Sequence, residues 1–359
     1  MTITINNKNK KTNVPNLRFP EFQGEWEYFL INDVCSEFKS GKNIKADFVF
    51  ECGEYPVYGG NGLRGYTSSY NHEGSYVLIG RQGALCGNVR SVYGKTYITE
   101  HAIAVAGNER SNTNFLHYLF LKMNLGQYSD QSAQPGLAVN KLLKLKVALP
   151  IISEQTKIAK FLSLLDERIA TQNKIIDKLQ TLIKGIAHKV SKQGKPNIRL
   201  SECLLCTSST LQESDVAEVG AYPVYGANGI VGYLDTYNTT SEAIYIIKDG
   251  SGVGAVSCVK GKCSATGTLN ILQTKEGFSL RYLYFILKVF SFEPYKTGMA
   301  IPHIYFKDYG KAKIYCPSNQ LQCKYADLLS KIEQKATAEQ KILDNLCSQK
   351  QYLLCQMFI

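Results

Sequence analysis

The twelve residues YPVYGGNGLRGY, from Tyr55 to Tyr66, return later in the chain as YPVYGANGIVGY, from Tyr222 to Tyr233. Nine of the twelve letters are the same, and 167 residues separate the two copies. Both copies contain an Asn-Gly pair, which tolerates positive φ and predicts a hairpin turn. Tyrosine and valine on either side are typical of strands. The phrase therefore predicts a β-hairpin that the protein builds twice.

The same offset relates other parts of the chain, as expected for an internal duplication. IGRQGALCGNV (79–89) aligns with IIKDGSGVGAV (246–256), KVALP (146–150) with KIYCP (313–317), and KIIDKL (174–179) with KILDNL (341–346). Each copy starts with short apolar runs separated by Gly and Asn, which predict strands and turns. Each copy ends in a long helical pattern. The sequence thus predicts a tandem repeat of a β-rich domain followed by a helix.

Both long helical patterns carry a coiled-coil seam, with spacings that alternate between four and three residues. Its members are Ile158, Leu162, Leu165, Ile169, Gln172, Ile176, Leu179, Ile183, Ile186 and Val190 in the first helix, and Tyr325, Leu329, Ile332, Ala336, Glu339, Leu343, Leu346, Lys350, Leu353 and Met357 in the second. The polar Gln172 and Glu339 occupy equivalent places, where such residues can fix register. Each helix could instead pack only on its own domain, but so long a seam favours a helix pair.

We therefore predict an α+β fold in which the two helices pair as an antiparallel coiled coil. The expected parts are a first domain over 17–150, a central spacer helix over 151–193, a second domain over 194–317 and a distal spacer helix over 318–359. An antiparallel pair would hold the domains at opposite ends. A seam of about 33 residues spans about 50 Å, which is more than one turn of duplex DNA, about 34–36 Å.

Composition limits the partners and the compartment. Lys and Arg number 41 against 30 Asp and Glu in 359 residues, a net charge of +11 that favours a polyanionic partner such as nucleic acid. We expect a cytoplasmic chain with reduced thiols, because neither a signal core nor a run of about 20 apolar residues is present. Cys203, Cys206, Cys258 and Cys263 could supply four zinc ligands. However, Ser91 and Thr96 replace the last two in the first copy, so no metal is expected.

Residues that differ between the copies are the better candidates for reading bases, because shared residues cannot distinguish two sequences. Arg81-Gln82 aligns with Lys248-Asp249. Arg81 and Lys248 suit guanine, Gln82 suits adenine and Asp249 suits cytosine. The shared phrase is interpreted mainly as scaffold, although Tyr58 and Tyr225 could stack on bases. A solvated loop is the alternative for each residue. The candidate DNA contacts are Arg64, Arg81, Gln82, Lys248, Asp249, Ser251, Asn61, Asn228, Lys39, Lys42, Gln134 and His303.

Three phrases together resemble the specificity (S) subunits of type I restriction–modification systems, and the resemblance covers essentially the whole chain. They are VPNLRFPEFQGEWE (14–27), the repeated YPVYGxNGxxGY, and LPxxSEQxKIxxFLxxLDxxI (149–169). The start of the second helix departs from the third phrase. It keeps Pro317, Gln322, Leu328 and Leu329 but lacks the Glu-Gln pair.

The resemblance implies that two target recognition domains each read one part of a bipartite, asymmetric DNA site. It also implies that the helices set the gap and dock two methyltransferase (M) subunits, which use S-adenosylmethionine to methylate adenine. Restriction (R) subunits would join with ATP and Mg²⁺ to cut unmethylated DNA. The chain itself would bind no cofactor and carry no catalytic residue.

Two other classes of function are the alternatives. An enzyme is disfavoured, because the sequence has no Asn-Pro-Pro-Tyr or Asp-Pro-Pro-Tyr phrase, no phosphate loop and only a weak dinucleotide-like GSGVG (250–254). A non-catalytic pair of domains on a coiled coil that does not bind DNA is the remaining alternative. A steep loss of binding with salt would favour DNA.

Overall fold

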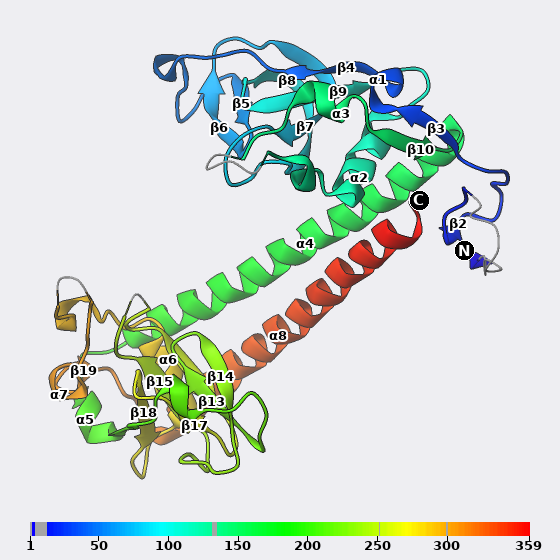
Figure 1. The fold of residues 1–359 in the computed structure, drawn as a ribbon. Coiled ribbons are helices and arrows are strands. Elements are labelled where there is room, and N and C mark those ends of the chain that lie inside the picture. The colour runs from blue at the N-terminus through cyan, green and yellow to red at the C-terminus, as the bar shows by residue number, and fades with distance from the viewer. Residues whose placement is uncertain (1, 4–12, 131–134, 251, 299–300) are drawn as a thin grey trace. The chain divides into compact units, whose positions relative to one another are not determined.

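The computed structural model describes residues 2–3, 13–130, 135–250, 252–298 and 301–359 (Figure 1). The chain forms two compact units, unit 1 with Met1–Thr171 and Leu343–Ile359, and unit 2 with Gln172–Ile342. Each unit contains one β-rich domain. Two long helices, α4 (Ile152–Ser191) and α8 (Asn319–Gln356), each contribute residues to both units.

The domain of unit 1 is built on a six-stranded sheet in the order β4-β9-β7-β8-β5-β6. Its strands are β4 (Cys35–Ser40), β5 (Tyr55–Gly59), β6 (Gly62–Thr67), β7 (His72–Gly80), β8 (Val89–Ile98) and β9 (Ala102–Gly107). Neighbouring strands are antiparallel except β5 and β8, which pair in parallel. Helix α2 (Thr113–Met123) lies between this sheet and α4, and its Phe115, Leu116 and Phe120 are completely buried in the core (Figure 1).

Shorter elements complete unit 1. Strand β3 (Glu27–Leu30) pairs with β10 (Lys146–Leu149), which leads directly into α4. The remaining elements are β1 (Thr2–Ile3), β2 (Leu17–Arg18), α1 (Ile31–Val34), α3 (Val139–Leu142) and the 3-10 turns Ala46–Phe48 and Leu125–Tyr128. Trp26 and Phe358 meet with ring centroids 6.3 Å apart, so the segment before β3 packs against the residues that follow α8.

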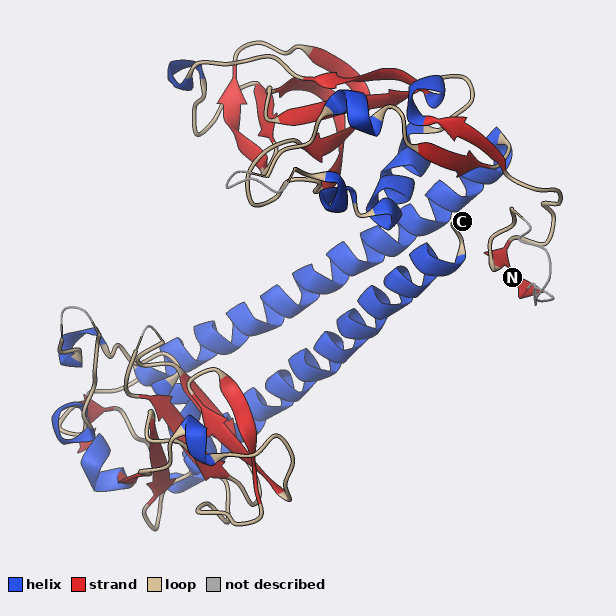
Figure 2. Ribbon diagram, in the orientation of Figure 1, coloured by secondary structure: helices blue, strands red, loops and turns tan. Residues whose placement is uncertain are grey.

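The domain of unit 2 repeats this plan with shorter strands. A four-stranded sheet has the order β12-β18-β15-β16, and a three-stranded sheet has the order β14-β13-β17. Figure 2 shows the strands of each domain in red and the helices in blue. The strands are β12 (Leu204–Ser208), β13 (Tyr222–Gly226), β14 (Gly229–Leu234), β15 (Ala243–Ile247), β16 (Val256–Val259), β17 (Ser264–Ala265) and β18 (Leu269–Thr274). Strand β11 (Ile198–Arg199) pairs with β19 (Lys313–Ile314). The helical elements are α5 (Leu200–Cys203), α6 (Leu280–Leu287), α7 (Phe306–Tyr309) and the 3-10 turns Glu213–Asp215 and Glu293–Tyr295.

The duplication is visible in the hydrogen-bonded register. Hairpin β5–β6 has a bulge between Val57 and Tyr58, and hairpin β13–β14 has one between Val224 and Tyr225. The predicted hairpin is therefore confirmed in both copies. The predicted position of its turn is wrong by one residue. The two loop residues are Gly60 and Asn61, because β6 already begins at Gly62, where φ is +106°. Glycine, and not asparagine, takes the positive φ.

The helices pair antiparallel in each unit, as the seam predicts. In unit 2 the Gln172 amide donates to the carboxylate of Glu339 at 2.5 Å and to its carbonyl oxygen at 3.0 Å, so the two polar seam residues face each other. Tyr325, near the start of α8, donates to Gln193, just beyond the end of α4, at 2.6 Å. In unit 1 the Lys350 ammonium lies 2.5 Å from the Asp166 carboxylate. All seam residues named from the sequence are buried or half-buried.

Candidate nucleic-acid interface

The loop after β7, which carries Arg81 and Gln82, is held by backbone hydrogen bonds on two sides. Arg81 N donates to His101 O at 2.9 Å, and Gly83 N donates to Pro135 O at 3.1 Å. Leu137 N donates back to Arg81 O at 2.9 Å. The side chain of Gln82 is exposed and that of Arg81 is half-exposed. The backbone of this loop is thus fixed while its two candidate base-reading side chains remain accessible.

The loop after β15 repeats the same framework at an offset of 167 residues. Lys248 N donates to Thr268 O at 2.9 Å, Gly250 N to Pro302 O at 3.1 Å, and Ile304 N to Lys248 O at 2.9 Å. His303 is brought to this loop, and its Nδ1 lies 2.7 Å from the carboxylate of Asp249. Three of the predicted residues therefore meet in unit 2.

Glycine is required at one position of each loop. Gly83 has φ +84° and Gly250 has φ +95°, in the left-handed region that favours glycine. A Cβ at either position would meet no atom within 4 Å, so the backbone conformation and not crowding selects glycine there. These glycines let each loop fold back on the segment that contains Pro135 or Pro302.

The hairpin turn of the repeated phrase packs against the loop in unit 1. A Cβ on Gly60 would come within 2.7 Å of His101 O and 3.4 Å of Gly80 Cα. The same Cβ would lie 3.6 Å from Arg81 N, so the exposed turn residue Asn61, next to Gly60, lies near Arg81. The exposed Arg64 of this hairpin packs its side chain over Gly59. In unit 1 the hairpin of the repeated phrase thus supports the variable loop beside it.

The two tyrosines of the phrase have mainly a packing role. Tyr58 is half-buried against the cluster of Leu78, Val92 and Ile98, and Tyr58 O accepts from Thr99 N at 2.9 Å. Tyr225 packs edge-on to Tyr245 with ring centroids 5.8 Å apart, and burial raises the pKa of its hydroxyl. These contacts favour the scaffold interpretation over base stacking.

The short connection between β8 and β9, residues 99–101, lies at the centre of this region, and the sequence did not single it out. It contacts the hairpin through Thr99 and the loop through His101, whose Nδ1 lies 3.1 Å from the Gln82 side chain. Lys42 is placed beside it, because Lys42 N donates to Ile98 O at 3.0 Å. No signal in one sequence marks His101, since strand pairing alone brings it to Gln82.

Other candidates are placed differently. Lys39 is exposed on β4, at the sheet edge opposite β6, and its ammonium lies 3.1 Å from the Glu37 carboxylate. Asn228 is exposed in the second hairpin turn. Gln134 and Ser251 lie outside the described residues.

The four cysteines considered as zinc ligands have other contacts. Cys263 Sγ lies 3.3 Å from the Tyr245 hydroxyl, and Cys258 Sγ lies 3.5 Å from the Glu242 carboxylate. Burial raises the pKa of the Cys203 thiol to about 12. Within the described ranges, no three His, Cys, Asp or Glu side chains come together as a metal site, and no helix is long and apolar enough to cross a membrane.

Each domain is fixed to its own long helix by a buried glutamine. Gln155 Oε1 accepts from Asn112 N at 2.9 Å, while its amide donates to Arg110 O at 2.9 Å and Pro150 O at 2.8 Å. Gln322 in unit 2 accepts from Ser279 N at 3.0 Å and donates to Pro317 O at 2.9 Å. Asn112 and Ser279 are the N-cap residues of α2 and α6. The duplicated glutamine thus ties the domain's packing helix to the start of α4 or α8.

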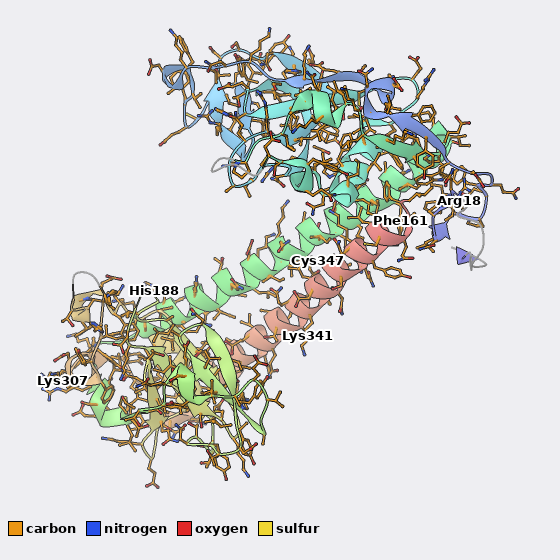
Figure 3. The ribbon with its side chains drawn as sticks, in the orientation of Figure 1. Arg18, Phe161, His188, Lys307, Lys341 and Cys347 are labelled. Atoms are coloured by element: carbon orange, nitrogen blue, oxygen red, sulfur yellow. The ribbon has the colours of Figure 1, made fainter. Side chains whose placement is uncertain are left out.

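A buried ion pair strengthens this junction in unit 1 only. The guanidinium of Arg18, which is labelled in Figure 3, donates two 2.7 Å hydrogen bonds to the carboxylate of Glu154. It also donates to the carbonyl oxygens of Gln23 and Gly24. Glu154 is completely buried. Leu321, which is exposed, takes its place at the start of α8. The departure of the second helix from the family phrase therefore removes this ion pair but keeps the glutamine contacts.

The model of the type I restriction modification DNA specificity domain matches the chain twice, over residues 23–181 and 203–347. The chain belongs to this family. It is 42% identical over 154 residues to the type I restriction enzyme EcoprrI specificity subunit of Escherichia coli, and 27% identical over 144 residues to a putative specificity subunit of Haemophilus influenzae. These matches cover 42% and 39% of the chain, and 38% and 37% of the two relatives. The resemblance inferred from the three phrases is confirmed.

Longer matches support the same fold. A putative type I specificity subunit of Mycoplasma genitalium is 24% identical over 365 residues, which is 91% of the chain and 92% of that relative. The crystal structure of a type I S subunit from M. genitalium superposes with a TM-score of 0.74 at 20% identity, covering 96% of the chain and 99% of that protein. A structure described in terms of assembly and conformational transition of the type I system gives 0.52 at 15% identity, covering 92% and 96%. The predicted fold class, including the two long helices, is confirmed.

Proposed function

We propose that this chain is the DNA sequence-specificity subunit of a type I restriction–modification complex. Each recognition domain would bind one half of a bipartite, asymmetric DNA site. One observation carries the proposal. The two loops share one backbone hydrogen-bond framework but present Arg81-Gln82 in one domain and Lys248-Asp249 in the other. A shared backbone framework that carries different side chains suits two domains that recognise different half-sites.

The side chains define the proposed chemistry of recognition. In a major groove, Arg81 would bind guanine and Gln82 would bind adenine through paired hydrogen bonds. In the second domain Lys248 would donate to guanine and Asp249 would accept from the amino group of cytosine. His303 bonds the Asp249 carboxylate and would orient it. Contacts to DNA phosphates from Asn61, Asn228, Lys39 and Lys42 would set register without carrying sequence information. Arg64, which aligns with Val231, would be a further base-reading residue of the first domain.

The remaining functions of the complex would belong to other subunits. Two methyltransferase subunits would dock on α4 and α8, and restriction subunits would join the larger assembly. S-adenosylmethionine, ATP and Mg²⁺ would bind those partners. This chain would supply no catalytic group and would fix the gap between the half-sites through its helices. The family membership supports these roles.

Exchange of the loop residues tests the proposal. The chain carrying Arg81→Lys and Gln82→Asp, produced with its methyltransferase subunits, should methylate a site that is altered in the first half only. The reciprocal Lys248→Arg and Asp249→Gln variant should alter the second half only. Sequencing that detects methylated adenine measures both. A change in both halves, or in neither half, from one exchange would contradict the assignment of these loops as readers.

The alternative of a paired-domain module that does not bind DNA makes a different prediction. A DNA-binding complex should lose affinity steeply with salt, because its basic groups release counterions from phosphates. Titration of the assembled complex with a duplex at several salt concentrations distinguishes the two. Indifference to duplex DNA would favour the module.

A further inference from the structure

A cluster of two tyrosines and one lysine is repeated in both domains, at the end of the hairpin away from its turn. In unit 1 the rings of Tyr55 and Tyr70 are 5.1 Å apart, and Lys95 Nζ lies 4.9 Å above Tyr70. In unit 2 the equivalent rings of Tyr222 and Tyr237 are 4.9 Å apart, and Lys262 Nζ lies 4.9 Å above Tyr237. We call each of these groups the tyrosine–lysine cluster. The spacing of the three side chains is similar in the two domains, although most of the sequence around Tyr70 and Lys95 has changed.

The cluster faces solvent. Tyr70 is 40% exposed and Tyr237 is 38% exposed, and both lysines are exposed. Neither lysine forms an ion pair with any part of the chain that the structure describes. In unit 1 the Tyr55 hydroxyl donates to Glu54 at 2.5 Å. The Lys95 ammonium and the Tyr70 hydroxyl are then the groups left to face a ligand.

Retention of these residues is not explained by the core. Between residues 68 and 98, Tyr70 and Lys95 are the exposed side chains that recur unchanged 167 residues later. The other identities in this stretch are glycines, buried or half-buried aliphatic residues, and Asn71, whose side chain bonds the backbone of Ile98. An exposed pair that survives while most of this stretch diverges indicates a shared ligand.

The backbone that presents the lysine is retained as well. Gly94 precedes Lys95 with φ +80°, and Gly261 precedes Lys262 with φ +86°. A Cβ at either glycine would meet nothing within 4 Å, so glycine serves the backbone conformation there. Both copies thus keep the bend that brings the lysine over the tyrosine ring.

We propose that the tyrosine–lysine cluster of each domain binds the sugar–phosphate backbone of duplex DNA independently of base sequence. This inference rests on the proposed function. The two half-sites differ in bases but share the phosphate backbone, so exposed residues common to both domains fit the shared part. A cation held over an aromatic face is attracted to the ring, which fixes the ammonium in place. The tyrosine hydroxyl can donate to a phosphate oxygen.

The position of the cluster suits this role. Strand β5 runs from Tyr55, in the cluster, to Gly59, and Gly60 then packs against the Arg81 loop. Five residues of strand cover about 16 Å at about 3.3 Å per residue. The major groove is about 12 Å wide. A hairpin laid across the groove would place the variable loop over the bases and the cluster over the phosphates at the edge.

The test uses the full chain assembled with its methyltransferase subunits, in which Lys95 and Lys262 are both replaced by glutamine. Binding is titrated against salt with a duplex that contains the methylated motif and with a duplex that lacks it. The slope of log K against log[salt] should fall by about 1.8, about 0.9 for each phosphate that a lysine no longer neutralises. Affinity for both duplexes should fall by a similar factor, and the methylated motif should stay the same.

The Lys146→Gln, Lys313→Gln variant is the matched control. Lys146 and Lys313 are also exposed, recur at the same offset and lie outside the cluster, and their replacement removes the same charge. The control should keep the wild-type slope, and both variants should keep the wild-type melting temperature. A Tyr70→Phe, Tyr237→Phe variant should weaken both duplexes alike and leave the slope unchanged.

Three results would overturn the inference. The cluster variant could keep the wild-type slope, the control could lower it equally, or the cluster variant could fail to assemble with the methyltransferase, which would indicate a protein-binding role. If the wild-type complex showed no salt-dependent DNA binding, the proposed function would fail first and this inference with it. The wild-type titration separates that failure from failure of the cluster alone.

Discussion

Replacement of Gln155 by alanine should loosen the junction between α2 and α4 in unit 1 and leave the second domain unaffected. The side chain is completely buried and makes three hydrogen bonds to backbone groups. Each contributes about 1 kcal/mol net, so the loss is about 3 kcal/mol. That loss corresponds to a local opening constant raised roughly 150-fold, since about 1.4 kcal/mol is a factor of ten.

Hydrogen exchange with mass spectrometry measures this directly. A peptide covering the start of α2, from Asn112, should exchange faster in the variant in proportion to the opening constant. A peptide covering the start of α6, from Ser279, is the internal control, because the duplication places an equivalent contact there. The Gln322→Ala variant should reverse the pattern with a smaller effect of about 2 kcal/mol, because it removes two hydrogen bonds.

Two results would contradict the role of Gln155. Unchanged exchange at α2 in the Gln155→Ala variant would show that the glutamine does not hold the domain on its helix. Equal acceleration in both peptides would show that the loss of stability is global. Either result would remove the buried glutamine as the residue that fixes each domain to its helix.

Two further predictions concern ionised groups. Arg18→Met leaves the buried Glu154 without its partner and should lower the free energy of unfolding by about 3–5 kcal/mol. The double variant Arg18→Met, Glu154→Leu should recover most of that loss. Denaturant titration measures both variants, and equal losses would contradict a stabilising role of the ion pair. The hydrogen bond from Gln172, with help from Lys335, holds the pKa of Glu339 below its usual 4.5. Stability from this carboxylate is therefore present above about pH 4.5 and lost as the pH falls through the lowered pKa. The Glu339→Gln variant should lose that part of the acid sensitivity in melting experiments, and an unchanged acid profile would contradict the assignment.

The duplication made much of the fold predictable. Each predicted strand or helix could be compared with its counterpart in the other copy, which lies at a constant offset. In α4 and α8, seam residues spaced alternately four and three positions apart identified the side chains that are buried between the helices. Gln172 and Glu339 stood out as polar members of that seam, and they do meet. These features are local or periodic, so one sequence carries them.

Contacts made by distant strand pairing were less accessible. His101 reaches Gln82 only because β7 and β9 are neighbours in the sheet, and nothing near His101 in the chain signals this. The role of Gln155 could have been predicted from the sequence. The equivalent residue of the second copy, Gln322, is also glutamine, although the residues next to it differ. The hairpin turn was misplaced by one residue because the Asn-Gly pair is a general turn signal, whereas the bulge after Val57 shifts the register here.

Recognition of a two-part DNA site by this chain is tested directly by sequencing methylated adenine in cells that produce the chain with its cognate methyltransferase subunits. We expect a motif of two different halves separated by a fixed gap, found only when this chain is present. A motif with two identical halves would contradict two readers of different sequence. Absence of any motif, with a methyltransferase shown to be active, would contradict the role in specificity.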